Sequence, residues 1–381
     1  MPDSKRLLHL VAFDIPEPPD YGGVIDIFYK IRALKDCGIS VMLHAFEYGK
    51  RGRAEALHGM CHQVHLYKRR TFKNLFYGDM PYITGSRDSA ELLENLSRVE
   101  APVIFEGLHS CYWLDHPSLE KRFKVVRTHN IEHDYYANLE AAETNFFKKY
   151  FFRVEAERLR KYEPILKKAG LIAAISPDDT GYFSRLYGHT EYVPAFHPNE
   201  EVDIQIGTGK FALYHGNLAV AENNQGALFL VNEVFNKLDY PCVIAGNQPS
   251  AQLKNAVSRY PHIRLEEGLD SEGVLRLIGE AQVNVLCTFQ GTGIKLKLIN
   301  ALYRGRHCVT NSVMVHHTGL ESMCRVSDDP EVLAQHISTL MNQPFTESDI
   351  TSRRELLQQQ FNNRNNAERL LQVMEQAKAW G

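Results

Sequence analysis

The first fifty residues alternate between short apolar runs and a helical repeat. Residues 7–13 form an apolar run that ends at Asp14, which predicts a buried strand. Pro and Gly dominate residues 16–23 and predict a loop. Apolar positions then recur at helical spacing over residues 24–35, and a second apolar run follows at 41–46. This order of elements indicates parallel strands joined by a crossover helix.

The same alternation recurs along the chain and falls into two sets. The first set continues with strands predicted at 103–105, 124–127 and 171–175, and with one long helix at 135–168. The second set has strands predicted at 211–214, 242–245, 263–265, 283–287 and 308–310, with helices at 225–238, 271–280 and 294–304. Residues 194–209, rich in Pro, Gly and acidic side chains, separate the two sets. The pattern predicts an α/β protein with two doubly wound, Rossmann-like domains.

Composition narrows the class of protein. The chain has 381 residues, 44% of them hydrophobic and 23% charged, which is typical of a soluble protein with two domains. A formal net charge of −3 argues against a nucleic-acid partner. The seven cysteines are scattered without a CxxC pair, and no segment approaches the ~20 apolar residues of a membrane span. We therefore expect a cytoplasmic protein, with peripheral contact at the inner membrane face left open.

Six loop motifs follow predicted strands or open predicted helices. They are residues 18–23 (Pro-Pro-Asp-Tyr-Gly-Gly), Arg127-Thr128-His129-Asn130, Ala174-Ile175-Ser176, His215-Gly216-Asn217-Leu218 with Asn223, Ala245-Gly246, and residues 291–302 with Gly305. Together they resemble the GT-B glycosyltransferases, in particular the retaining family-4 type (glycosyl transferases group 1). The resemblance implies GT-B architecture, with two Rossmann-like domains facing across a cleft. It implies an acceptor-binding domain at 1–200, a nucleotide-sugar-binding domain at 201–355, and a C-terminal helix at 356–381 that returns to the N-terminal domain.

The same resemblance implies a donor site. In the family, such glycines let backbone N–H groups approach the phosphates of the donor, and the helix that follows presents its positive N-terminus. The donor-binding residues expected here are Gly22, Gly23, Gly216, Asn217, Gly246, Gly291, Thr292, Gly293, Ile294, Lys295 and Asn300.

Helical geometry separates the two lysines of this segment. If the helix begins at Ile294, Lys295 and Lys297 point to different sides, whereas Lys297 and Asn300, three residues apart, share a face. We therefore assign Lys297 to the diphosphate and Asn300 to the ribose hydroxyls. Lys295 reaches a phosphate only if the helix starts later. The alternative is that both lysines are merely solvated.

Sugar transfer requires positive potential where the leaving diphosphate gathers negative charge. The chain contains no Asp-x-Asp motif of the kind that metal-using transferases show, so we expect neither a metal nor a cofactor. Lys297 and His129, the latter in the loop after a buried strand, are the expected catalytic residues. Glu106 and Glu132 are the candidates for acceptor contact, each with a plain loop or helix-start role as the alternative.

The function expected from the resemblance is metal-independent, retaining transfer of a sugar from a nucleotide-diphosphate donor to a saccharide or lipid-linked acceptor, in cell-surface polysaccharide synthesis. Two alternatives stay open. One is another GT-B enzyme such as a nucleotide-sugar 2-epimerase. The other is a non-catalytic binding or partner protein, because Asn217, Glu222, Thr292 and Asn300 stand where many family members have charged residues.

A basic stretch with interleaved aromatic residues, residues 146–168, leaves a membrane contact open as well. Such a stretch can dock on anionic lipid. A helix with one core face and one solvated face is the alternative explanation.

Overall fold

The computed structural model describes residues 6–47, 49, 51, 54–71, 78–143, 145–289, 295–316 and 318–380. The chain divides into two compact units, with boundaries after Pro198 and after Gln360. Residues 6–198 and 361–380 form the N-terminal unit, and residues 199–360 supply the C-terminal unit. The second boundary lies at the end of a helix, whereas the sequence placed it at residue 355. Among the described residues, no helix combines the length and apolar character that crossing a bilayer needs.

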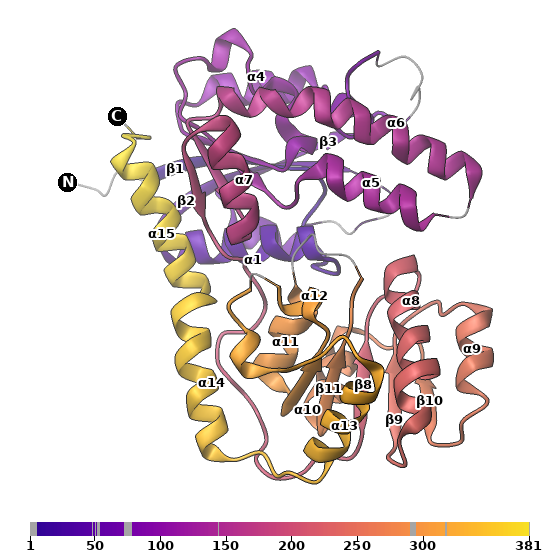
Figure 1. The fold of residues 1–381 in the computed structure, drawn as a ribbon. Helices are drawn as coiled ribbons and strands as arrows, with labels where there is room; N and C mark the ends of the chain where they lie inside the picture. The colour runs from indigo at the N-terminus through magenta and orange to yellow at the C-terminus, as the bar shows by residue number, and fades with distance from the viewer. Residues whose placement is uncertain are drawn as a thin grey trace. The chain divides into compact units, whose positions relative to one another are not determined.

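The N-terminal unit is built on a parallel sheet of seven strands in the order β3-β2-β1-β4-β5-β6-β7. Figure 1 labels β1, β2 and β3 of this sheet. Its strands are β1 (Arg6–Ala12), β2 (Ile39–Glu47), β3 (Gln63–Lys68), β4 (Val103–Glu106), β5 (Lys124–Thr128), β6 (Leu171–Ala174) and β7 (Thr190–Tyr192). Its helices are α1 (Gly22–Asp36), α2 (Glu55–Met60), α3 (Tyr82–Gly85), α4 (Ala90–Arg98), α5 (Glu132–Ala142), α6 (Phe146–Tyr162), α7 (Pro177–Tyr187) and α15 (Asn363–Gln376), with 3-10 turns at η2 (Leu108–Trp113), η3 (Pro117–Leu119) and η4 (Glu163–Lys168).

Alternate residues of each strand face opposite sides of this sheet, as the period of a strand requires. Leu8 and Leu10 of β1 pack with α1 and α15 in one core, whereas Val11 packs on the other side with Leu159 of α6 and Phe183 of α7. Both faces are therefore covered, which leaves the edge formed by the strand ends as the place where polar side chains gather.

The C-terminal unit has a parallel sheet of six strands in the order β10-β9-β8-β11-β12-β13. Its strands are β8 (Ala212–His215), β9 (Cys242–Ala245), β10 (Ile263–Glu266), β11 (Val283–Leu286), β12 (His307–Thr310) and β13 (Arg325–Val326). Its helices are α8 (Ala221–Phe229), α9 (Ala251–Val257), α10 (Ser271–Glu280), α11 (Leu296–Arg304), α12 (Ser312–Val315), α13 (Pro330–Met341) and α14 (Glu347–Gln360), with a π-helical turn η5 (Leu230–Val234) and 3-10 turns η6 (Phe235–Lys237) and η7 (Glu321–Met323). The predicted fold class, two Rossmann-like units with parallel sheets, is confirmed.

Three expected helices differ from the structure. The single helix expected at 135–168 is an antiparallel pair, α5 and α6, because Glu143 is extended and Asn145 starts a new helix. The Asn145 side chain accepts hydrogen bonds from the backbone N–H groups of Phe147 and Lys148, at 3.1 and 3.2 Å. The helix expected at 225–238 begins earlier, in α8, and loosens into a π-helical turn, while α11 begins at Leu296 rather than at Ile294.

Candidate active site

The strand order reverses once in each sheet, between β1 and β4 and between β8 and β11. In doubly wound folds, ligands bind outside the carboxyl ends of the strands at this reversal. The carboxyl end of β4 is Glu106, and His129 directly follows β5 beside it. The carboxyl end of β8 is His215, and the loop after β11 leads to Lys295 and Lys297. These two edges, called here the N-terminal edge and the C-terminal edge, contain most of the residues expected from the sequence.

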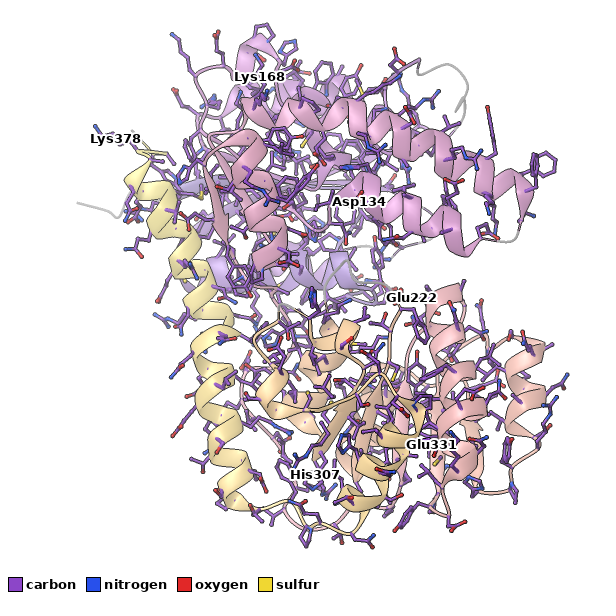
Figure 2. All side chains as sticks on the ribbon, in the orientation of Figure 1. Asp134, Lys168, Glu222, His307, Glu331 and Lys378 are labelled. Atoms are coloured by element: carbon purple, nitrogen blue, oxygen red, sulfur yellow. The ribbon has the colours of Figure 1, made fainter. Side chains whose placement is uncertain are left out.

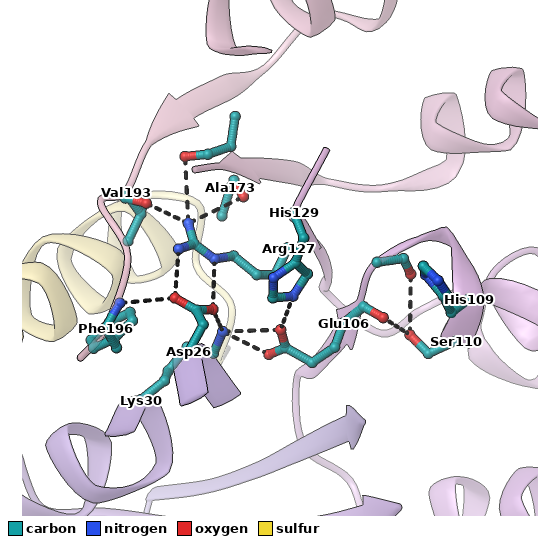
Figure 3. Close-up of polar contacts among 12 residues, drawn as sticks. Asp26, Lys30, Glu106, His109, Ser110, Arg127, His129, Ala173, Val193 and Phe196 are labelled. Carbon is teal, nitrogen blue, oxygen red and sulfur yellow. Dashed lines mark hydrogen bonds and ion pairs between the residues drawn. The ribbon is translucent and has the colours of Figure 1, made fainter. Parts of the chain in front are cut away.

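A fully buried ion-pair cluster underlies the N-terminal edge (Figure 3). The Lys30 ammonium, on α1, lies 2.9 Å from a carboxylate oxygen of Asp26 and 2.9 Å from one of Glu106. Arg127 of β5 donates from Nη2 to Asp26 Oδ1 at 3.0 Å and from Nε to Oδ2 at 3.3 Å. Two cations thus face two carboxylates inside the domain, and each charge has an opposite partner.

Arg127 also links the end of β5 to the segment that follows β7. Its guanidinium donates to the carbonyl oxygens of Val193 and Pro194, while Asp26 accepts from the backbone N–H of Phe196 at 2.8 Å. Burial alone would raise the pKa of Asp26, but the charges of Arg127 and Lys30 outweigh it and hold that pKa well below its usual range. Asp26 is therefore ionised at neutral pH, and the cluster is a fixed scaffold.

His129 connects this scaffold to the edge. Its Nε2 lies 3.0 Å from Glu106 Oε2, and the side chain is 5% exposed. Its Nδ1 has no hydrogen-bond partner among the described residues. The His129 ring meets the Phe13 ring edge-on, and a Cβ on Gly23 would come within 2.6 Å of Phe13, so Gly23 admits the aromatic ring at the start of α1. Glu106 is fully buried and reaches a ligand only through His129.

Several buried polar atoms around His129 lack hydrogen-bond partners in the described part of the chain. They are Thr128 Oγ1, Asn130 Oδ1, Glu132 Oε1 and His109 Nδ1. Buried polar groups are nearly always satisfied, by protein, water or ligand, so a group of such atoms indicates a polar binding site.

The carboxyl group of Glu132 is unusual within this group. Burial, reinforced by the nearby Asp179 charge, raises the pKa of Glu132 to about 8. Its Oε1 lies 3.8 Å from His109 Nδ1, and burial holds the pKa of His109 well below its ordinary value. Both groups are therefore neutral at pH 7, which suits the recognition of uncharged hydroxyl groups.

Asp26, Glu106 and His129 each offer one ligand atom, and these atoms lie within 4.8 Å of one another. Their geometry would accept a metal ion. The Lys30 ammonium and the Arg127 guanidinium already bind the two carboxylates, however. The cations of the protein thus supply the charge that a metal would bring.

The C-terminal edge holds an excess of positive charge. Lys295 directly precedes α11 and Lys297 lies in its first turn. Burial lowers the pKa of both lysines, to about 8 for Lys295, while the nearby carboxylate of Glu222 opposes the shift. The Lys297 ammonium donates to Asn223 Oδ1 at 2.6 Å and lies 5.5 Å from the centre of the Tyr214 ring. Because α11 begins only at Leu296, the condition stated for Lys295 to reach a phosphate is met. The Glu222 carboxylate acts on the pKa of both lysines.

Two further side chains shape this edge. Glu222, labelled in Figure 2, lies at the start of α8 and accepts a hydrogen bond from the Thr288 hydroxyl after β11. His215 is buried, and burial together with the Lys297 charge lowers its pKa to about 3. Its Nε2 has no partner among the described residues. One acid thus faces two lysines and a neutral histidine, so the edge stays net positive.

The glycines of the C-terminal edge pack closely. A Cβ on Gly246 would lie 2.0 Å from the carbonyl oxygen of Gly216, so the turn after β8 rests directly on the end of β9. Asn217 is exposed, and its Oδ1 accepts from the backbone N–H of Ala219 at 3.1 Å. Close packing alone accounts for Gly246, and donor contacts of Gly216, Asn217 and Gly246 stay predictions.

Asn300 has a partner away from the lysines. Its Oδ1 accepts from Asn199 Nδ2 at 2.8 Å, and Asn199 in turn accepts from Arg304 on the next turn of α11. The predicted ribose contact of Asn300 stays a prediction. Gly291, Thr292, Gly293 and Ile294, also expected to bind the donor, lie outside the described residues. Gly22 is the first residue of α1.

The structure adds residues that the sequence did not single out. Asp26 and Lys30 lie on a helix and meet Glu106 and Arg127 only through the fold, so no spacing in the sequence indicates them. His109 likewise joins Glu132 from a 3-10 turn. His215 had a signal, since it ends a strand directly before a glycine turn.

Comparison with known sequences adds two findings. Residues 209–343 match the model of the family described as glycosyl transferases group 1. An uncharacterized 44.6 kDa protein in the cps region of Klebsiella pneumoniae is 25% identical over 348 residues, which cover 86% of this chain and 89% of that protein.

Solved structures share the fold at low sequence identity. The crystal structure of TarM is similar with a TM-score of 0.70 at 10% identity, covering 98% of this chain and 99% of TarM. The structure of Anabaena HepE in complex with UDP and glucose is similar with a TM-score of 0.64 at 10% identity, covering 97% and 99%. At these identities the likeness concerns the arrangement of the chain.

Proposed function

We propose that this chain, a glycosyltransferase of the GT-B fold whose residues 209–343 match the glycosyl transferases group 1 family, moves a sugar from a nucleoside diphosphate to a hydroxyl acceptor. The C-terminal edge would bind the donor and the N-terminal edge the acceptor. The observation that carries this assignment is the lysine pair, Lys295 and Lys297, whose charges are opposed by the carboxylate of Glu222.

The lysines would act when the bond between the anomeric carbon and the diphosphate breaks. Negative charge then develops on the leaving phosphate oxygen, and preorganised cations stabilise it without rearranging at that moment. Lys297 is held by Asn223 and by the face of the Tyr214 ring, so its ammonium is already in place. This arrangement supports a reaction without a metal, which is part of the proposal.

The N-terminal edge would receive the acceptor. Neutral Glu132 and His109 can exchange hydrogen bonds with hydroxyl groups, and the unpartnered Nδ1 of His129 offers one more contact. Glu106 fixes the orientation of the His129 ring through Nε2. We further propose that the acceptor hydroxyl attacks from the face that the phosphate leaves, with retention at the anomeric carbon.

The biological acceptor is proposed to be a saccharide or a lipid-linked saccharide of a cell-surface polysaccharide. The relative from Klebsiella pneumoniae supports this choice, since its name places it in a cps region. The structure of HepE, solved with UDP and glucose, makes UDP-sugars the first donors to try.

The reaction class can be tested with wild-type protein and a panel of nucleotide sugars. We expect one donor to release its nucleoside diphosphate slowly in water and faster with a saccharide acceptor, and the product linkage to be of the same anomeric type as the donor. Conversion of the free donor to its 2-epimer would instead establish an epimerase. Neither binding nor turnover of any donor would contradict the proposal and favour a binding protein.

A further inference from the structure

The start of α6 exposes large aromatic side chains. Phe146, Phe147 and Tyr150 are 75%, 81% and 62% exposed, and no other large apolar residue in the described part of the chain is exposed as much. The Asn145 side chain caps the first turn of α6 with two hydrogen bonds. These rings are therefore presented to the surroundings by a capped helix end.

The helix behind these rings is more basic at its surface than its sequence suggests. Residues 146–168 contain eight basic and three acidic residues. Glu155 is 1% exposed and accepts hydrogen bonds from the backbone N–H groups of Tyr82 and Ile83. Glu163 is 2% exposed and binds the hydroxyl groups of Tyr182 and Tyr187.

Two of the three acids are thus buried and hydrogen-bonded inside the domain. Only Glu157 remains at the surface of this segment, against the exposed cations Lys148, Arg153, Arg160, Lys161, Lys167 and Lys168. Arg153 pairs with Glu140 of α5 at 2.7 Å and Lys161 lies 3.8 Å from Asp79, so the excess comes from the other four. The exposed face has a local excess of positive charge, although the whole chain has a formal net charge of −3. Figure 2 labels Lys168 at the end of this run and Asp134 on the neighbouring α5.

Aromatic and basic residues share one face of α6. At 3.6 residues per turn, Phe146, Tyr150, Arg153 and Lys161 project on the side opposite to the buried Glu155 and Leu159. The one exposed acid of the segment, Glu157, projects on the same side, so aromatic rings and cations outnumber it there. A helix with this distribution fits the plane of a bilayer interface, where rings enter the headgroup level and cations meet anionic lipid.

We propose that the outward face of α6, led by Phe146, Phe147 and Tyr150, docks the protein on an anionic lipid bilayer. The docking does not depend on the donor site. Its one consequence for activity, that a lipid-linked acceptor would be met at the bilayer, rests on the proposed function.

Vesicle sedimentation of the whole protein tests the docking. The vesicles are phosphatidylcholine alone and an equimolar mixture with phosphatidylglycerol. We expect the wild type to sediment with the mixed vesicles, less so at high salt, and not with phosphatidylcholine alone. The triple variant Phe146→Ala/Phe147→Ala/Tyr150→Ala should bind at least about tenfold more weakly, because each aromatic ring buries apolar surface at the interface. Arg160→Glu/Lys161→Glu, which reverses two exposed charges on the outward side of α6, should weaken binding to mixed vesicles similarly.

Matched controls use exposed residues of the C-terminal unit. Ile206→Ala removes an apolar side chain that is 59% exposed, and Lys210→Glu/Lys254→Glu reverses two surface charges; both should bind vesicles as the wild type does. An unchanged urea-denaturation midpoint in every variant shows that the fold is intact. In addition, Phe147→Trp should shift its fluorescence to the blue with mixed vesicles.

Two results would overturn the proposal. One is equal vesicle binding by the wild type and the aromatic triple variant. The other is absence of vesicle binding together with a wild-type dimer, seen by sedimentation velocity, that the triple variant loses; the rings would then cover a second copy.

Discussion

The two sheets place comparable edges at the reversal of strand order, yet the edges differ in charge. Around His129, Lys30 and Arg127 are balanced by Asp26 and Glu106, and all four are buried and bonded to one another. Around His215, two lysines face the carboxylate of Glu222. The same fold element therefore makes a neutral, rigid scaffold in one unit and a positive site in the other.

This difference is the basis of the proposed assignment of donor and acceptor. A diphosphate gains from net positive charge near it, whereas an uncharged sugar gains from hydrogen-bonding groups that carry no charge. The neutral Glu132 and His109 lie at the N-terminal edge, and the paired lysines lie at the C-terminal edge. Variants at the two edges should consequently fail in different ways, the first in stability and the second in donor handling.

The largest effect is expected from breaking the buried charge balance. Asp26→Asn leaves Lys30 and Arg127 with one carboxylate between them, and an uncompensated buried charge costs about 3–5 kcal/mol of unfolding free energy. Urea denaturation followed by circular dichroism measures this loss. Glu94→Gln, which breaks the exposed pair with Arg98, should change stability little. Equal stability of the Asp26→Asn variant and the wild type would contradict the role of the cluster.

The next effect is on turnover. Lys297→Ala should lower kcat by roughly 10²–10³-fold, as does the removal of a preorganised group that stabilises developing charge. Lys297→Arg should retain part of the activity because the charge stays. Lys254→Ala, which removes a surface lysine paired with Glu267 in the same unit, serves as the matched control. A Lys297→Ala enzyme with wild-type kcat would exclude this lysine from catalysis.

A third prediction concerns the protonation of Glu132. Burial raises its pKa from 4.5 to about 8, so between these values the folded protein holds a proton that the unfolded chain releases. The free energy of unfolding should therefore fall as pH rises through this range. Glu132→Gln removes that dependence and should stabilise the protein at pH 7 by up to about 3 kcal/mol. Denaturation midpoints across pH measure it, and a destabilised variant with unchanged pH dependence would refute the neutral carboxyl.

The smallest expected effect is a fall in donor affinity as the pH rises. Burial lowers the pKa of Lys295 to about 8, so its ammonium loses the proton as pH rises through that value. Affinity for a nucleoside diphosphate should then fall by about tenfold per pH unit at most. Titrations at several pH values should show that in Lys295→Arg the fall in affinity for the nucleoside diphosphate begins at a higher pH. A wild type with constant affinity from pH 7 to pH 9 would separate Lys295 from the phosphates.

The sequence predicted the fold well where patterns are local. Buried parallel strands such as β1 and β9 read as plain apolar runs, and both alternating sets emerged from them. The half-buried β3 and the short β7 and β13 offer no such run and were not predicted. The break between α5 and α6 has a local signal, the capping Asn145, which the continuous helical pattern around it conceals.

The sites were predictable only in part. Lys297 and His129 lie in motifs that resemble a known family. The residues that hold them in place are not part of these motifs. Lys30 and Glu106 are 76 positions apart in the sequence, and Asp26 and Arg127 are 101 apart. Likewise, Glu222 stands in the sequence where many family members have a basic residue, and only the fold shows that it accepts a hydrogen bond from Thr288. Contacts of this kind depend on topology, which no spacing in one sequence specifies.

The donor diphosphate is proposed to bind the lysine pair of the C-terminal unit. Isothermal titration of nucleoside diphosphates, UDP first, into the wild type, Lys297→Ala and His129→Ala tests it most directly. We predict that Lys297→Ala weakens binding by about 10–100-fold, as expected for a lost charge-assisted hydrogen bond, while His129→Ala leaves it unchanged. Undiminished binding in Lys297→Ala, or loss of binding in His129→Ala alone, would contradict the assignment of the donor to the C-terminal edge.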